Sequence, residues 1–319
     1  MKRDIHIVIN KSEITAGTRG ASLGPEAMMA AARKEESLLF GQFPIEYTGH
    51  MNHLLDKPVK YPHAKRIEGL LQVFSNISDQ VSSLLDDKKF PLVIAADHGS
   101  AGGTIAGIAK ANPGKRLGVI WIDAHGDLHT PYTTPSGNMH GMPLATAISE
   151  DNLPCKKNEI SHEETAMWQR LKDMSVPGAK LNSEDLVFIA VRDTEPEEDA
   201  LLERLNIKNH TVDEVRAKGT SQIISEVLDQ LSDCDILYIS FDVDSMDPEH
   251  TSHGTGTPVD NGLTPEEART FLTAFAKEER TVCMEVVEVN PCLDEKTNKM
   301  AEVAFDLFKS LTQALTHGG

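Results

Sequence analysis

The chain has 319 residues, of which 39% are hydrophobic and 25% are charged, so it can bury a sizeable core and has an ordinary globular composition. Its 49 acidic and 31 basic residues give a net charge of −18. This balance disfavours nucleic acid or an anionic membrane as a partner, because phosphate binding requires clustered lysine and arginine. It is compatible with a small cationic substrate.

The sequence predicts neither a targeting signal nor disulfides. The apolar run at residues 5–9 is too short and too polar for a signal peptide, and no stretch approaches the roughly 20 apolar residues of a membrane span. The four cysteines lack both a CxxC pair and the spacing of a disulfide framework, which favours a reducing, cytoplasmic setting. Cys234 and Cys283 stand in apolar segments and are predicted to be buried.

Short apolar runs alternate with helical patterns along the chain, which predicts a parallel sheet covered by helices. The first helix is predicted to start at Pro25 and to run towards Leu39, and a second covers residues 66–85. A third begins at Thr264 with an N-cap, a proline and an acidic first turn, and a fourth covers residues 299–315. Five runs are nearly continuous in apolar residues, as in strands buried on both faces: 91–95, 117–122, 186–191, 236–241 and 282–289.

The domain organisation follows from the same alternation. The chain contains no internal repeat and no low-complexity linker, and the polar stretch at residues 149–164 is interpreted as a long connection. We therefore expect one domain, residues 1–319, of the three-layer α/β/α class with a parallel sheet.

Aspartates and histidines follow three of the predicted strands. His98 comes after the strand at 91–95, a second set follows the strand at 117–122, and a third follows the strand at 236–241. Ligands collect at the carboxyl ends of strands in open parallel sheets, so these groups are expected at one edge. The candidate ligands are His98, Asp123, His125, Asp127, Asp242 and Asp244.

The number and type of these side chains indicate a pair of metal ions. In an extended strand, residues two apart point the same way, so Asp123 with His125 and Asp242 with Asp244 form pairs if the strands continue. Imidazole and carboxylate ligands suit Mn²⁺, Zn²⁺ or Fe²⁺, and the absence of thiolates argues against structural zinc. Two ions about 3.5–4 Å apart, bridged by two carboxylates, would accommodate six ligands. Caps, turns and hydrogen-bonded histidines explain such residues singly, but not all six together.

Several motifs resemble those of the arginase, or ureohydrolase, family. They occur in the family's order over most of the chain, from about residue 14 to 291. The resemblance implies an arginase-like sheet of about eight strands, a homotrimer or homohexamer, and hydrolysis of L-arginine to L-ornithine and urea. The motifs are Ala96-Asp97-His98, Asp123-Ala124-His125-Gly126-Asp127, Ser136-Gly137-Asn138-Met139-His140-Gly141, Ser240-Phe241-Asp242-Val243-Asp244-Ser245-Met246-Asp247-Pro248, Gly256-Thr257-Pro258 and Glu285-Val286-Val287-Glu288-Val289-Asn290-Pro291.

The resemblance also implies a role for each candidate ligand. His98 and Asp127 would bind one Mn²⁺, and His125 and Asp244 would bind the other. The remaining two aspartates, at positions 123 and 242, would bridge both ions, and a bridging hydroxide would attack the guanidinium carbon. Co²⁺ or Ni²⁺ could replace Mn²⁺ in such a site.

Catalytic and substrate-binding residues are carried over in the same way. Glu288 matches the family's guanidinium-binding carboxylate, and His140 matches its proton-shuttle histidine, since an imidazole titrating near neutrality can protonate a leaving amine. Asp127 belongs to the catalytic set as well as to the ligands. The resemblance implies that five further residues bind the substrate: His129, Ser136, Asn138, Glu195 and Thr257.

Two of these positions depart from the usual arginase pattern. Arginases usually carry Asn where this chain has His129, and Asp where it has Glu195. Another guanidino or amidino compound, such as agmatine, guanidinobutyrate or formimidoylglutamate, is therefore an alternative substrate. A non-catalytic metal-binding oligomeric scaffold is the alternative from another functional class. The basic residues between 57 and 66 are expected to form solvated surface.

Overall fold

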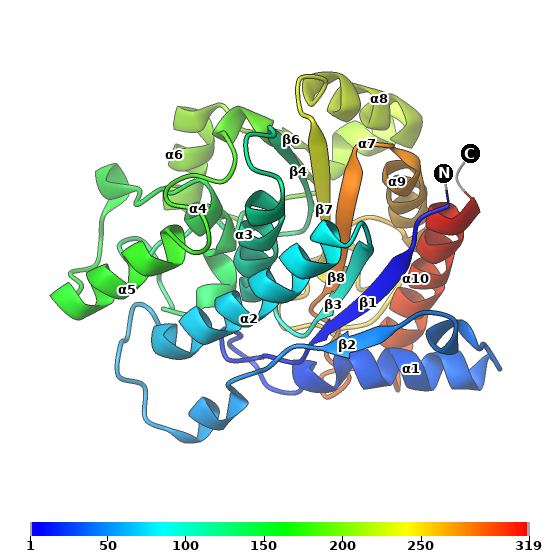
Figure 1. Cartoon of the computed structure of the whole chain (residues 1–319), viewed down its shortest axis with the longest axis horizontal. Helices are drawn as coiled ribbons and strands as arrows, with labels where there is room; N and C mark the ends of the chain where they lie inside the picture. Colours follow the sequence, from blue (N-terminus) through cyan, green and yellow to red (C-terminus); the bar gives the residue numbers. More distant parts are fainter. Residues whose placement is uncertain (1, 318–319) are drawn as a thin grey trace.

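A computed structural model describes residues 2–317. Its centre is an all-parallel sheet of eight strands in the order β2-β1-β3-β8-β7-β4-β5-β6 (Figure 1). The strands are β1 (Ile5–Asn10), β2 (Ile45–Tyr47), β3 (Phe90–Ala95), β4 (Leu117–Ile122), β5 (Leu186–Ile189), β6 (Lys208–His210), β7 (Ile236–Asp242) and β8 (Thr281–Val287).

Ten α-helices connect and cover the strands in the described part of the chain. The two ends of this part lie close together, because Arg3 N donates a hydrogen bond to Leu315 O at 3.3 Å. Among residues 2–317, no helix has the length and apolar character needed to cross a bilayer. The helices are α1 (Gly24–Lys34), α2 (Ile67–Asp86), α3 (Ala101–Ala111), α4 (Pro143–Ala147), α5 (His162–Lys172), α6 (Pro196–Leu205), α7 (Val212–Lys218), α8 (Thr220–Gln230), α9 (Pro265–Lys277) and α10 (Lys299–His317).

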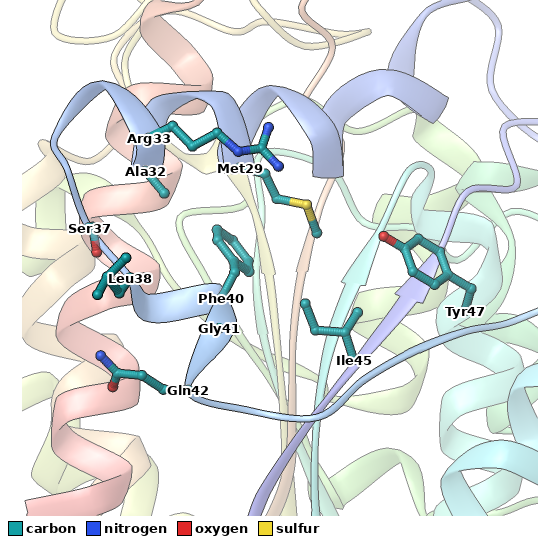
Figure 2. A pocket seen from close by; sticks show the side chains of 10 residues that line it. All are labelled: Met29, Ala32, Arg33, Ser37, Leu38, Phe40, Gly41, Gln42, Ile45 and Tyr47. Atoms are coloured by element: carbon teal, nitrogen blue, oxygen red, sulfur yellow. The ribbon is translucent and has the colours of Figure 1, made fainter.

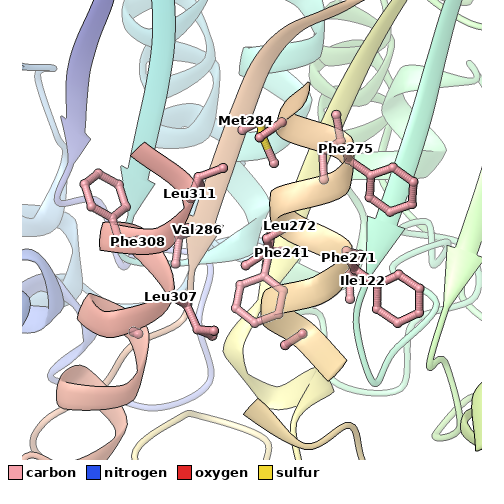
Figure 3. Packing of buried hydrophobic residues seen from close by; sticks show 14 of the residues in the cluster. Ile122, Phe241, Phe271, Leu272, Phe275, Met284, Val286, Leu307, Phe308 and Leu311 are labelled. Carbon is pink, nitrogen blue, oxygen red and sulfur yellow. The ribbon is translucent and has the colours of Figure 1, made fainter. Parts of the chain in front are cut away.

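Alternation along the strands creates two buried layers, because successive side chains point to opposite faces. On one face, Ile120 of β4 and Ile239 of β7 pack with α1, α8, α9 and α10, and Figure 3 shows part of this layer. On the other face, Trp121 and Tyr238 pack with side chains of α2, α3 and α4. The three-layer parallel fold predicted from the sequence is confirmed.

The elements with strong local signals lie where the sequence predicted them. Thr264 caps α9: its hydroxyl accepts from Glu267 N at 3.2 Å, and the Glu267 carboxylate accepts from Thr264 N at 2.7 Å. The five predicted strands are present within a few residues. Cys234 and Cys283 are buried, as expected.

Other boundaries differ from the prediction. The first helix ends at Lys34 instead of continuing to Leu39, and Glu36 then takes a left-handed conformation with φ 55°. The connection at 149–164 already contains the first turn of α5, where Ser161 and Glu164 form a capping box. Three strands were not predicted. The edge strands β2 and β6 have three residues each and carry polar side chains, and the apolar run of β1 was considered only as a signal-peptide core.

Candidate metal centre and substrate cleft

The six candidate ligands meet at one edge of the sheet. Strands β3, β8, β7 and β4 are consecutive neighbours, so the residues that follow their carboxyl ends are brought together. His125 is partly exposed, and the other five are buried. The convergence expected from the sequence is therefore present.

Tight local turns position these residues. Asp123 Oδ1 accepts a hydrogen bond from His125 N at 2.8 Å, and Asp242 Oδ1 accepts one from Asp244 N at 2.8 Å. Each aspartate thus folds the chain back on itself, so the extended conformation considered in the sequence analysis does not continue beyond the strand ends. Asp127 has φ 50°, a left-handed conformation that is uncommon outside glycine.

One group of candidate ligands surrounds His98. Its Nδ1 atom lies 3.0 Å from an Asp123 oxygen, 3.2 Å from an Asp127 oxygen and 3.2 Å from an Asp242 oxygen. Three carboxylates therefore face a single imidazole nitrogen inside the protein. Such an arrangement suits a cation bound among them.

A second group adjoins the first and shares Asp123 with it. His125 Nδ1 lies 3.1 Å from an Asp244 oxygen and 3.5 Å from Asp123 Oδ1. Within each of two triads, His98 with Asp123 and Asp127, and Asp123 with His125 and Asp244, the ligand atoms lie within 4.8 Å of one another. A shared aspartate between two groups is the geometry expected of a bridging ligand.

Buried polar atoms that lack hydrogen-bond partners indicate that these residues could bind metal ions. His98 Nδ1 and Asp123 Oδ2 are buried and form no hydrogen bond, although they lie 3.0 Å apart. Burial and the neighbouring Asp123 raise the pKa of Asp127, and burial with Asp244 raises the pKa of Asp242. Divalent cations would satisfy both the unpaired atoms and the accumulated negative charge, so the donor set fits two metal ions.

The opposite side of the His98 ring is also fixed. Its Nε2 atom lies 2.7 Å from the hydroxyl of Ser240, a strand residue two positions before Asp242. The ring stacks on the buried indole of Trp121, with centroids 4.0 Å apart and planes within 4°. Sequence reasoning gave no role to Ser240 or Trp121, although Ser240 stands in a quoted motif and shares a strand face with Asp242.

Glu288 lies against this centre at the end of β8. Its Oε1 atom accepts a hydrogen bond from His98 N at 2.9 Å, and burial followed by the nearby Asp97 raises its pKa to about 8. His140 Nδ1 is 3.8 Å from the same oxygen. Burial, with the nearby His125 and His98, lowers the pKa of His140 to about 4, so its imidazole is neutral near pH 7, whereas the sequence analysis expected titration near neutrality.

Of the other predicted substrate residues, Thr257 contacts a candidate ligand, whereas Ser136 contacts Asn138, and Asn138 contacts Lys65. Thr257 donates to Asp244 Oδ2 at 3.1 Å, and the Ser136 hydroxyl accepts from Asn138 N at 3.1 Å. Lys65 was expected in solvated surface, but it is partly buried and donates to Asn138 Oδ1 at 3.0 Å. Sequence spacing gave no signal for this contact, because 73 residues separate the two positions.

His129 and Glu195 meet beside the metal centre. His129 Nε2 lies 2.9 Å from Glu195 Oε2 and 3.5 Å from Glu198 Oε2. Glu198 Oε1 accepts from Leu128 N at 3.0 Å, which ties the start of α6 to the segment after Asp127. Burial, with the adjacent Glu195, raises the pKa of Glu198 to about 8.

A separate cavity lies between α1 and the edge strand β2 (Figure 2). Its volume is about 740 Å³, and its walls include Met29, Phe40, Ile45 and Tyr47. None of the predicted site residues lines it, so it has no part in the metal centre.

Comparisons with known proteins give a consistent result. Residues 3–313 match the model of the arginase family. Arginase from Bacillus subtilis is 33% identical over 98% of this chain and 98% of its own, and arginase from Bacillus caldovelox is 34% identical over 92% of each. The native crystal structure of Bacillus caldovelox arginase superposes with a TM-score of 0.80 at 32% identity, covering 98% of both chains.

Proposed function

Because the chain belongs to the arginase family of hydrolases acting on linear amidines, we propose that it hydrolyses L-arginine to L-ornithine and urea with two Mn²⁺ ions. The observation that supports this most directly is the pair of buried ligand groups sharing Asp123, with Glu288 beside them. The curated relatives most similar to this chain include several named arginase.

The ligand assignment follows the two groups. We assign His98 and Asp127 to one ion and His125 and Asp244 to the other, with the aspartates at 123 and 242 between them. Two bound cations lower the pKa of water enough to provide a nucleophile near neutral pH. Co²⁺ and Ni²⁺ are the alternative occupants.

Glu288 orients the substrate in this proposal. A planar guanidinium is well matched by a carboxylate with two acceptor oxygens. A bound cation favours the ionised form of Glu288, which offsets the cost of its burial. The guanidinium carbon is thereby held next to the metal centre.

His140 handles the proton. Its imidazole is neutral near pH 7, so it can accept a proton and pass it to the departing amine as the C–N bond breaks. The products are then urea and an amine that leaves in its protonated form. His140 therefore serves as a shuttle that is reloaded in each turnover.

A second candidate function is hydrolysis of another guanidino or amidino compound. His129 and Glu195 favour it, because both differ from the residues usual in arginases and they contact each other close to the candidate ligands. Even a displacement of about 1 Å can cost 10²-fold in rate, so these residues bear on substrate choice.

A substrate panel tests the proposal. Protein reconstituted with Mn²⁺ is incubated with L-arginine, agmatine, 4-guanidinobutyrate and formimidoylglutamate, and urea or formamide is measured. We expect the highest kcat/KM with L-arginine. Equal or faster turnover of agmatine would favour the second candidate function over arginine hydrolysis. Two bound Mn²⁺ ions without turnover of any compound would indicate a non-catalytic scaffold.

Two further expectations remain proposals. We propose that residues 1–319 form one domain and that the chain assembles as a homotrimer or homohexamer. Light scattering coupled to size-exclusion chromatography gives the subunit count. A monomeric mass of about 35 kDa would contradict the assembly.

A further inference from the structure

The two residues that depart from the usual arginase pattern contact each other. His129 follows β4 and Glu195 precedes α6, so 66 residues separate them in sequence, yet Nε2 and Oε2 lie 2.9 Å apart. Asn at 129 or Asp at 195 would be too short to reach across this contact. The two departures are therefore matched in size.

His129 is itself held in place. Its ring is buried, and Nδ1 lies 3.1 Å from the Thr133 hydroxyl. That hydroxyl accepts from Thr130 N at 3.0 Å and can donate its own proton to Nδ1. In the tautomer with a proton on Nε2, His129 donates to Glu195.

With both ring nitrogens engaged, His129 has no nitrogen left for a substrate carboxylate. Glu195, by contrast, has a side chain that is 48% exposed, so it remains accessible to a ligand. The neighbouring Glu198 is buried and already accepts hydrogen bonds from Leu128 N at 3.0 Å and Glu195 N at 3.3 Å. Glu195 is thus the accessible carboxylate of this cluster.

We propose that His129 is a positioning residue that fixes Glu195 for the primary ammonium group of a guanidino substrate, so that the pair acts as one specificity unit. The proposal rests on the proposed function and deepens it. It predicts a preference for guanidino compounds that carry an amine, such as L-arginine and agmatine, over 4-guanidinobutyrate, which carries only a carboxylate. The exposed Asp193 nearby adds to the negative charge that favours an ammonium group.

The test is a double-mutant cycle with His129→Asn, Glu195→Asp and the double variant. Coupled residues lose their interaction once, so we expect each single variant to lower kcat/KM for L-arginine about ten-fold relative to 4-guanidinobutyrate. The double variant, which carries the pair usual in arginases, should lose no more than either single variant. The loss should fall mainly on KM, because the guanidinium site is untouched. Independent residues would give about a hundred-fold loss in the double variant, which would overturn the proposal.

Matched controls make the same chemical changes elsewhere. His162→Asn at the start of α5 and Glu203→Asp on α6 alter exposed residues that have no contact with the site. They should leave the arginine to 4-guanidinobutyrate ratio at the wild-type value. Melting temperature and manganese content should match wild type in all variants, and a parallel loss on both substrates would mark a merely structural role.

A binding measurement separates this proposal from the proposed function. L-Ornithine carries the relevant ammonium group and 5-aminopentanoate lacks it, and neither is hydrolysed. Calorimetry on the Mn²⁺-loaded proteins should show a wild-type preference for L-ornithine that falls about ten-fold in each single variant and no further in the double variant. If the wild-type protein releases no urea but prefers L-ornithine in this way, only the proposed function fails. If the wild-type protein does not prefer L-ornithine to 5-aminopentanoate, the proposed role of the His129–Glu195 pair is refuted.

Discussion

Glu288 directly follows β8 and has a left-handed backbone conformation, with φ 68°, which is uncommon for a residue with a side chain. Such strain persists only where the surroundings hold it in place, and here the carboxylate accepts from His98 N. The candidate ligands were predictable because their motifs are local. The Lys65–Asn138 and His129–Glu195 contacts were not predictable, because each depends on how distant loops pack.

Replacing Glu288 with Gln keeps its size and removes its charge. We expect kcat/KM for L-arginine to fall by about 30-fold or more, because breaking a buried charge pair costs roughly 2–5 kcal/mol. Steady-state urea release measures the change. Glu279→Gln, an exposed position just before β8, is the matched control, and activity above a tenth of wild type in Glu288→Gln would contradict the assigned role.

Asp242 and His140 should respond differently to alanine. Asp242 faces His98 among the candidate ligands, so Asp242→Ala should lose metal and activity together. His140→Ala should retain both ions and lose about 10²-fold or more in kcat, the usual contribution of proton transfer. Elemental analysis and urea assays on the same samples compare them, and two retained ions in Asp242→Ala would exclude a bridging role.

At the scale of elements, prediction succeeded where local chemistry decides the outcome. The Thr264 capping box and the long apolar strands carry their own signals. The edge strands β2 and β6 do not, because each becomes a strand only by pairing with β1 or β5. The end of α1 at Lys34 is closed by local hydrogen bonds, from Glu36 N to Arg33 O and from Ser37 N to Ala32 O, around a left-handed Glu36 where the sequence offers no glycine.

The loop that carries Ser136 and Asn138 depends on Gly137. This glycine has φ 77°, and a Cβ atom there would collide with the carbonyl oxygen of Pro62. We expect Gly137→Ala to lower the free energy of unfolding by about 1–3 kcal/mol and to raise KM for L-arginine, because the loop must shift. Denaturant melts and steady-state kinetics measure both effects.

Gly114 provides the control for backbone strain alone. It has φ 80°, but a Cβ atom at this position would meet nothing within 4 Å. Gly114→Ala should lose about 1 kcal/mol and leave KM unchanged. If both alanine variants behaved alike, the close approach to Pro62 would have no bearing on the substrate loop.

For the whole molecule, the layered sheet was predictable from the alternation of apolar strands and amphipathic helices. The same architecture concentrates four aspartates and two histidines where water is largely excluded. Without cations, burial opposes charge on His98 and His125, yet neighbouring aspartates raise the pKa of both imidazoles. Stability and metal content should therefore be linked.

Metal removal should lower the melting temperature. Ligands that bind only the folded state stabilise it by mass action, so chelation should cost roughly 5 °C or more. In the chelated protein, His98, His125, Asp127 and Asp242 have raised pKa values, and the stability they contribute is lost as pH rises through those values. Asp123 opposes this trend as a single group, because the adjacent His125 and His98 imidazoles lower its pKa despite its burial.

Calorimetric melts between pH 6 and pH 8, with and without Mn²⁺, check this expectation. The gap between the two forms should widen as pH increases. A melting temperature that is independent of Mn²⁺ at every pH would show that the cluster does not bind the ion in the folded state.

Because Trp121 stacks on His98, its fluorescence should respond to metal binding at the candidate centre. The chain has only two tryptophans, and the other, Trp168, lies on α5 in a different buried cluster. Trp168→Phe would leave one indole, in face-to-face contact with a candidate ligand. Its emission should dim as paramagnetic Mn²⁺ fills the site, so that occupancy could be followed by fluorescence during turnover.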